Sequence, residues 1–165
     1  MLRAPTLKES DRYAGGMAQT LTSLLVHVVF STKNRQPWIT PEARAPLYRY
    51  MGGIARNHRS PMLAAGGVSD HVHLLISLSK NIALAPLVMD LKKDSSKWIK
   101  GEIGRRAFAW QDGYEGFTIG QSQVAALERY FERQEAHHRR VTFQDEMRAF
   151  FRKYHVAYDE RYVWS

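Results

Sequence analysis

The sequence has no cysteine, which excludes disulfide bonds, zinc sites with sulfur ligands and catalysis by a thiol. It has no apolar run near the ~20 residues that span a bilayer, and residues 1–16 lack the apolar stretch of a secretory signal. Internal repeats and low-complexity segments are missing as well. We therefore expect a protein that works in the cytoplasm and has no membrane partner.

Acidic residues are comparatively scarce. The chain has 16 aspartate and glutamate residues against 24 lysine and arginine residues, which gives a formal net charge of +8. A small basic protein attracts polyanions, of which nucleic acid is the commonest, and an anionic membrane surface is the weaker alternative. The 165 residues, 44% of them hydrophobic and 12% aromatic, are enough for one globular domain with a hydrophobic core.

Apolar periodicity divides the chain into short strands and amphipathic helices. We expect strands at 23–30, 62–68, 71–77, 107–110 and 116–119, and helices at 41–58, 84–101, 123–138 and after Thr142. This order predicts an α+β fold, a ferredoxin-like or RRM-like sandwich whose mostly antiparallel sheet has helices packed on it. Residues 1–20 are expected to be a flexible leader, and residues 21–165 a single domain.

Two histidines flank a hydrophobic residue in the predicted strand 71–77. Because side chains alternate across a strand, His71 and His73 point to one face, while Val72 and Leu74 point to the other, into the core. Two imidazoles on one face of a rigid strand are a suitable pair of metal ligands. A pair of exposed strand histidines without a role is the alternative, and the motif alone does not distinguish the two.

A tyrosine and a glutamine lie four positions apart on the predicted helix 123–138. Residues four apart share a helix face, so Tyr130 and Gln134 can present a phenol and an amide oxygen to one pocket. A tyrosine that attacks phosphorus stores the broken bond as a phosphotyrosine ester. A metal that polarises the phosphate lessens the demand on a phenol whose ordinary pKa is about 10. Taken alone, the pair fits an ordinary helix equally well.

These motifs occur together with other segments in the same order as in one known protein family. Residues 70–75 (DHVHLL) resemble the histidine–hydrophobe–histidine motif of single-tyrosine HUH transposases, and residues 130–138 are similar to their catalytic helix. Segments 28–35, 91–99 and 110–114 also agree, and the resemblance runs from about Leu24 to the end. These transposases belong to small insertion sequences that move as single-stranded DNA, and they are related to the REP-associated tyrosine transposases.

The resemblance implies a reaction and the residues that perform it. His71 and His73 would be metal ligands, Gln134 the third ligand and Tyr130 the nucleophile, with Mg²⁺ or Mn²⁺ as the cofactor. The enzyme would cleave and rejoin single-stranded DNA at element ends through a 5′-phosphotyrosine intermediate with a free 3′-OH. Residues 21–165 would be the HUH catalytic domain, acting in the bacterial cytoplasm or nucleoid.

The resemblance also implies two kinds of partner. Family members recognise imperfect DNA hairpins and form homodimers, and in several of them the tyrosine helix works on the metal site of the other subunit. The candidates for DNA contact are basic residues of the loop after the first strand and of the helix 84–101, namely Lys33, Arg35, Lys92, Lys93 and Lys97. A solvated helix face is the alternative for each helix lysine.

Five further residues have both a structural and a functional interpretation. We expect His27 to be a buried, hydrogen-bonded residue, with a place near the metal pocket as the alternative. Asp70 either accepts a hydrogen bond from a histidine that binds the metal, and so orients that histidine, or is a plain turn residue. His137 and His138 are expected to have a helix-end role, with an approach of either one to the metal as the alternative. Trp110 is expected in the core rather than stacked on a base.

Two other functions fit the same residues. A domesticated or inactive relative would bind structured DNA through its basic face and would not need the metal site. A metal-dependent nuclease would use His71 and His73 as ligands and water as the nucleophile, leaving Tyr130 a structural role. A covalent protein–DNA intermediate distinguishes the transposase from both.

Overall fold

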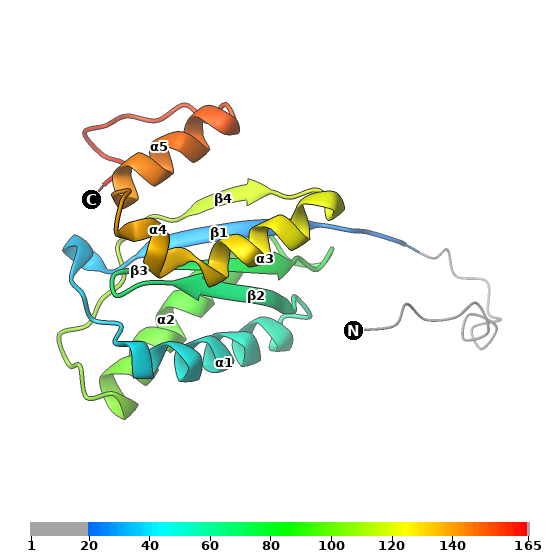
Figure 1. The fold of residues 1–165 in the computed structure, drawn as a ribbon. Coiled ribbons are helices and arrows are strands. Elements are labelled where there is room, and N and C mark those ends of the chain that lie inside the picture. The colour runs from blue at the N-terminus through cyan, green and yellow to red at the C-terminus, as the bar shows by residue number, and fades with distance from the viewer. Residues whose placement is uncertain (1–19, 165) are drawn as a thin grey trace.

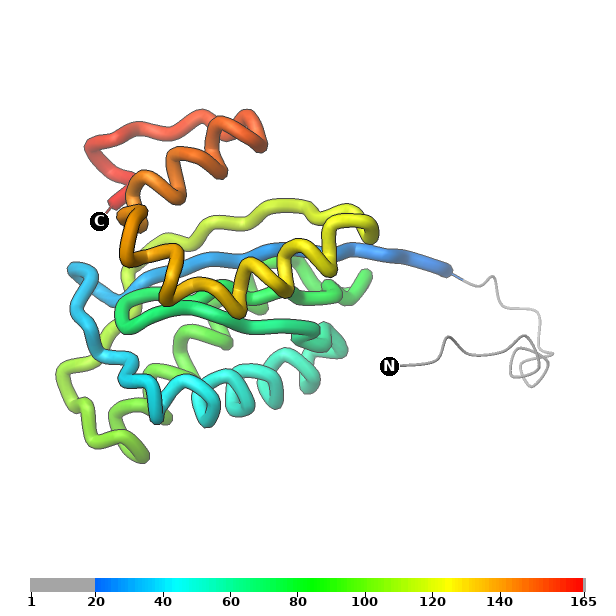
Figure 2. The backbone as a smooth tube through the Cα atoms, in the orientation of Figure 1, coloured from blue at the N-terminus to red at the C-terminus, as the bar shows by residue number. Residues whose placement is uncertain are grey.

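The computed structural model describes residues 20–164 and contains one four-stranded sheet with helices on both faces (Figures 1 and 2). The strand order is β2-β3-β1-β4, and every neighbouring pair is antiparallel. The elements are β1 (Leu25–Ser31), η2 (Lys33–Arg35), α1 (Pro41–Asn57), β2 (Met62–Gly67), β3 (His71–Ser77), α2 (Leu84–Glu102), β4 (Glu115–Thr118), η3 (Gln121–Gln123), α3 (Val124–Glu132), α4 (Gln134–His138) and α5 (Phe143–Lys153). The predicted α+β sandwich with a ferredoxin-like strand order is confirmed.

The predicted leader, residues 1–20, lies outside the described residues except for Thr20. Within residues 20–164, no helix is both long and apolar enough to cross a bilayer.

Helices α1 and α2 cover one face of the sheet, and α3 and α4 lie over the opposite face (Figure 1). The first face carries the main core, which includes Val28 and Phe30 of β1 and Val72 and Leu74 of β3. Trp110 packs into this core too, where its indole N–H donates to Ser95 Oγ at 3.0 Å. The expected core position of Trp110 is confirmed.

The opposite face of β1 and β3 is also buried, but its side chains are mixed. Leu25 and Leu75 pack against Leu127 and Phe131 of α3. Val29 of β1 and Phe117 of β4 form a second small cluster with Phe143, Met147 and Phe151 of α5. The histidines of β1 and β3 lie on this face, between the two clusters, because the alternation of the strands leaves them no other side. The two central strands, β1 and β3, are thus buried on both faces.

The turn between β2 and β3 depends on a glycine. Gly67 has φ +147°, and a Cβ there would lie 2.3 Å from the carbonyl oxygen of His71. This conformation suits glycine far better than any residue with a side chain. The turn sets the register in which Gly66 pairs with His73, and therefore fixes where the histidines of β3 lie relative to β2.

The predicted strand at 107–110 does not form. Trp110 makes only an isolated bridge to Thr32, with two flanking backbone bonds: Lys33 N–H to the Ala109 carbonyl at 2.8 Å and Gln111 N–H to the Ser31 carbonyl at 2.9 Å. The segment cannot extend its pairing, because its partner turns away at once into η2. Apolar residues at 107–110 therefore reflect burial in the core and not membership of the sheet.

The predicted single helix 123–138 is broken. Arg133 leaves helical geometry (φ −99°, ψ 9°), so α3 ends at Glu132 and α4 begins at Gln134. The Arg133 N–H bonds the carbonyl of Tyr130, only three residues back, at 3.2 Å. The break lets the Gln134 amide turn inward and form buried hydrogen bonds, which offset the loss of regular helical bonding.

Helix α3 approaches the sheet closely because β2 has no side chain at the contact. A Cβ on Gly66 would lie 2.7 Å from both the Cβ and the carbonyl oxygen of Phe131. Phe131 is the neighbour of Tyr130, so this approach sets the height of the tyrosine above the sheet.

We expect Gly66→Ala to lower the free energy of unfolding by about 1–3 kcal/mol, because the added methyl forces α3 away from β2. Gly53→Ala is the control, since no atom lies within 4 Å of a Cβ at this position in α1. That change should stabilise the helix by up to about 1 kcal/mol. Urea unfolding followed by circular dichroism measures both. A Gly66→Ala protein as stable as the wild type would contradict the close approach.

Candidate active site

His71 is held in place by a chain of polar contacts that starts at η2. Its Nδ1 lies 2.8 Å from Asp70 Oδ1, and the other Asp70 oxygen accepts two bonds from Arg35, at 2.7 and 3.2 Å. The Arg35 guanidinium also stacks on the Phe143 ring at 3.7 Å. Although burial opposes it, hydrogen bonds from His71 and Arg35 lower the pKa of Asp70 to about 2. An ionised Asp70 accepts the Nδ1–H, so the lone pair of His71 is on Nε2. This nitrogen faces away from Asp70, into a cluster of buried polar side chains that also contains Gln134.

His73 is fully buried beside a second histidine. Its Nδ1 lies 2.9 Å from His27 Nε2, and their rings stack with centroids 5.2 Å apart. The His73 Nε2 atom points the other way and has no hydrogen-bond partner among the described residues. His27 is therefore both buried and hydrogen-bonded, as expected, and it stands directly behind a candidate ligand.

The short helix α4 contributes two side chains to the same cluster. Gln134 is buried, and its Oε1 lies 3.3 Å from His71 Nε2 and 3.1 Å from His138 Nε2. His138 is therefore part of the cluster, which was the alternative to the helix-end role expected from its position in the sequence. Its Nδ1 lies 3.0 Å from the Val141 carbonyl, which orients Nε2 inward.

Helix α5 contributes Glu146, which is only 3% exposed. One carboxylate oxygen, Oε1, accepts hydrogen bonds from the Tyr130 hydroxyl and from Gln134 Nε2. The other, Oε2, lies 3.2 Å from His138 Nε2 and 3.6 Å from His73 Nε2, with no hydrogen bond of its own. Burial raises the pKa of Glu146 to about 8.

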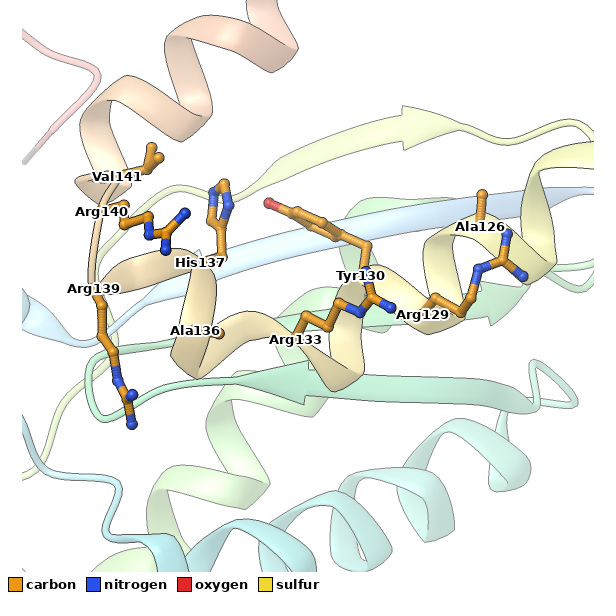
Figure 3. Close-up of a pocket in the computed structure, with 9 residues that line it drawn as sticks. All are labelled: Ala126, Arg129, Tyr130, Arg133, Ala136, His137, Arg139, Arg140 and Val141. Atoms are coloured by element: carbon orange, nitrogen blue, oxygen red, sulfur yellow. The ribbon is translucent and has the colours of Figure 1, made fainter.

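Tyr130 projects from the end of α3 over the cluster. Its ring meets His73 edge-on, with centroids 5.8 Å apart, and meets His137 in the same way at 5.4 Å. The side chain is half-buried, and Figure 3 shows its hydroxyl directed toward His137. All four predicted residues, Tyr130, Gln134, His71 and His73, are thus brought together by a single chain.

The composition of the cluster fits a divalent cation. His71, His73, His138 and Glu146 each offer a ligand atom within 4.8 Å of the others. Most of the converging atoms are acceptors, and two of them, His73 Nε2 and Glu146 Oε2, are buried without a partner. Burial lowers the pKa of His71, and that of His73 falls well below its usual 6.5. Neutral imidazoles and a carboxyl oxygen without a hydrogen-bond partner offer lone pairs that a metal ion satisfies.

A pocket of about 650 Å³ opens beside Tyr130 and is strongly basic (Figure 3). Its lining includes the exposed side chains of Arg129, Arg133, Arg139 and Arg140. None of these four guanidinium groups forms an ion pair with an acidic residue within the described part of the chain. We call these four residues the arginine face.

The cations predicted to contact DNA are arranged differently. Lys33, Arg35, Lys93 and Lys97 each lie within 4.0 Å of a carboxylate oxygen, on Asp112, Asp70, Asp90 and Asp94 respectively. Lys92 donates to the carbonyls of Gln111, Asp112 and Gly113, at 2.6–3.1 Å. An ammonium has three donors, so this loop occupies Lys92 completely. Of these five cations only Arg35 borders the cluster, behind Asp70, and its guanidinium is already paired with that carboxylate.

A family model described as "Transposase IS200 like" matches residues 20–134, which is well over half of the chain. The chain belongs to the IS200-like transposase family. Transposases of this kind transfer DNA strands, and both predicted motifs, His71–His73 and Tyr130–Gln134, lie inside the matched residues. The match stops at Gln134, short of the chain end that the resemblance had led us to expect, so Glu146 and His138 lie beyond it. No curated protein matches the chain.

Two solved structures share the fold of this IS200-like transposase. One, described as a "putative transposase from deinococcus radiodurans r1", has 21% identity and a TM-score of 0.59, covering 73% of this chain and 97% of its own. The other is a REP-associated tyrosine transposase bound to a REP hairpin, with 12% identity and a TM-score of 0.55, covering 76% and 74%. At these identities the likeness establishes the fold.

Glu146 and the arginine face were not predicted from the sequence. Glu146 belongs to the buried stripe of α5, together with Phe143, Met147 and Phe151. A carboxylate within an otherwise apolar stripe is the signal that points to it, because an unpaired charge is costly to bury. The arginine face carried no comparable signal, since sequence does not show which cations lack partners.

We expect Arg35→Ala to lower the free energy of unfolding by about 2 kcal/mol, because it removes the cationic partner of a half-buried Asp70 and uncovers Phe143. Lys97→Ala is the control, because an exposed lysine near a single carboxylate contributes less than about 0.5 kcal/mol. Chemical denaturation measures both. Equal stability of the two variants would contradict a structural role for Arg35.

Proposed function

We propose that this protein cleaves and rejoins single-stranded DNA, with Tyr130 as the nucleophile and His71, His73 and Gln134 as ligands of Mg²⁺ or Mn²⁺. The observation that supports this most is the position of the Tyr130 hydroxyl at the rim of a cluster of buried acceptors. A structural tyrosine would need neither the cluster nor the open basic pocket beside it.

The proposed reaction uses the parts of the site in distinct ways. The Tyr130 oxygen attacks the phosphorus, the bond from phosphorus to the 3′ oxygen breaks, and the products are a 5′-phosphotyrosine and a free 3′-OH. A bound metal supplies Lewis-acid polarisation of the scissile phosphate. Asp70 and His27 orient the two histidines from behind, and α3 holds the phenol above them. Attack by a 3′-OH on the phosphotyrosine reverses the step and rejoins a strand.

The arginine face is the proposed contact for the DNA backbone. Guanidinium groups that form no ion pair with a carboxylate can bind phosphates, and these four surround the pocket into which Tyr130 opens. We include hairpin DNA in the proposed substrate, which is consistent with the REP hairpin held by one of the structural neighbours. The lysines of α2 are less suited, since aspartates of the same helix lie beside Lys93 and Lys97.

The cellular setting and the assembly stay predictions from the resemblance. We propose that the protein acts on nucleoid DNA in the bacterial cytoplasm, and that it forms a homodimer whose mass light scattering would show. Because one chain brings Tyr130, Gln134, His71 and His73 together, we propose that the tyrosine serves the metal site of its own chain.

We expect Tyr130→Phe to abolish covalent attachment of DNA, because the phenol oxygen is the attacking atom. The substrates are single-stranded oligonucleotides from both flanks of the gene, labelled at the 3′ end, since that fragment stays on the tyrosine. Wild-type protein with Mn²⁺ should give a labelled protein band on a denaturing gel. EDTA added before the DNA should prevent formation of this band. Tyr158→Phe, at an exposed tyrosine, should behave as the wild type.

The same assay separates the alternative functions. A covalent adduct formed by Tyr130→Phe would refute the assignment of the nucleophile. Cleavage by the wild type without any adduct would identify a nuclease that uses water. Binding with neither cleavage nor adduct, with either metal, would identify a DNA-binding relative.

We expect Arg133→Ala and Arg129→Ala each to weaken binding of a single-stranded oligothymidylate several-fold. The logarithm of the binding constant should also fall less steeply with salt, by about 0.7 in slope per lost phosphate contact. Lys93→Ala is the control and should change neither quantity, because Asp90 already pairs this lysine. Fluorescence anisotropy over a range of salt concentrations measures both. Unchanged slopes for the arginine variants would exclude this face as the DNA contact.

A further inference from the structure

Glu146 lies beyond the family-matched residues, yet it occupies the centre of the site. Helix α5 delivers it from the apolar stripe that packs on β1 and β4. No lysine or arginine forms an ion pair with this carboxylate in residues 20–164; the side-chain nitrogens that could pair with it within 4.0 Å belong to histidines. A carboxylate with a purely structural role at this depth would normally be paired with a cation or fully hydrogen-bonded.

The two oxygens of Glu146 face different groups. Oε1 accepts the Tyr130 hydroxyl and the Gln134 amide, so it touches the atom that would attack phosphorus. Oε2 is directed at the imidazoles, 3.6 Å from His73 Nε2 and 3.9 Å from His71 Nε2. The carboxylate therefore bridges the nucleophile and the candidate metal ligands. Hydrogen-bond contact with the proton to be removed is the geometric requirement for a general base.

We propose, on the basis of the function proposed above, that Glu146 is a catalytic residue that holds the Tyr130 hydroxyl and accepts its proton during strand cleavage. The acceptor is supplied by α5, a helix outside the region that matches the family. Its second oxygen faces His73 and His71, so the same carboxylate contacts the nucleophile and lies beside the candidate metal ligands.

The proton transfer balances within the cleavage step. As the phenol oxygen bonds to phosphorus, its proton moves to Glu146 Oε1, and the bond from phosphorus to the 3′ oxygen breaks. The attacking and leaving oxygens are in line on opposite sides of the phosphorus, so Glu146 cannot reach the leaving oxygen. That oxygen takes a proton from solvent water, and Glu146 later releases its own proton to solvent. In rejoining, the attacking 3′-OH loses its proton to solvent water, and Glu146, protonated again from solvent, gives a proton to the departing phenolate.

The test compares Glu146→Gln with the wild type in the covalent-adduct assay. The amide oxygen of glutamine still accepts the hydroxyl hydrogen bond but cannot take the proton, so adduct formation should slow by about 100-fold. Glu128→Gln, at an exposed glutamate of α3, is the matched control and should keep the wild-type rate. Mn²⁺ binding without DNA, measured by calorimetry, sets the metal concentration that saturates each protein.

A fluorinated tyrosine at position 130 separates proton transfer from positioning. Its more acidic phenol needs less help from a base, so the loss in Glu146→Gln should shrink from about 100-fold to about tenfold. If Glu146→Gln lowers the rate of adduct formation equally with both tyrosines, the proposal is overturned. A defect in positioning or in metal binding would not depend on the acidity of the phenol. A Glu146→Gln variant that forms the adduct at the wild-type rate also overturns the proposal. Thermal unfolding of the variant excludes a folding defect as the cause.

The outcomes also separate this inference from the function on which it rests. A wild-type protein that forms adducts, with a Glu146→Gln variant that forms them equally fast, refutes the role of Glu146 alone. A wild-type protein that forms no adduct refutes the proposed function and the role of Glu146 together.

Discussion

The burial of β1 and β3 on both faces is the constraint on which the rest of the structure depends. One face is filled by aliphatic and aromatic side chains against α1 and α2. On the other, the same alternation presents His27, His71 and His73 to a space that α3, α4 and α5 enclose. Because β3 pairs with β1 and with β2 in a fixed register, the histidines cannot move without disturbing the core on the opposite face. The apolar core thus stabilises the geometry of the polar cluster.

The enclosed face gathers acceptors at a cost that the fold must offset. Glu146 Oε2 and His73 Nε2 are desolvated without hydrogen bonds, and each such group costs about 1–3 kcal/mol. The interactions nearest to these two atoms that offset this cost are the surrounding aromatic contacts and the ion pair of Arg35 with Asp70. A cation would remove the penalty by giving these atoms a common partner. The free energy of cation binding would therefore add to the stability of the fold.

The sequence predicted what depends on local pattern and failed where tertiary contacts decide. The strand His71–Ser77 was predicted with its observed bounds, because alternation and a turn define it. The break at Arg133 was not predicted, since no glycine or proline marks it and the gain comes from contacts of Gln134 with residues far along the chain. Arg35 looked like a free loop cation, but its positive φ of 56° turns it back onto Asp70 and Phe143. Pairing of this kind is invisible until the chain is folded.

The break at Arg133 explains how one short segment serves two environments. A continuous helix would keep Tyr130 and Gln134 on one stripe, both facing the sheet or both facing solvent. With the break, Gln134 is buried against His71, while Arg133 next to it is exposed on the arginine face. Tyr130 lies at the boundary, half-buried, with Glu146 on its inner side and the basic pocket on its outer side. A nucleophile that must lose a proton inward and meet a phosphate from outside requires a position of this kind.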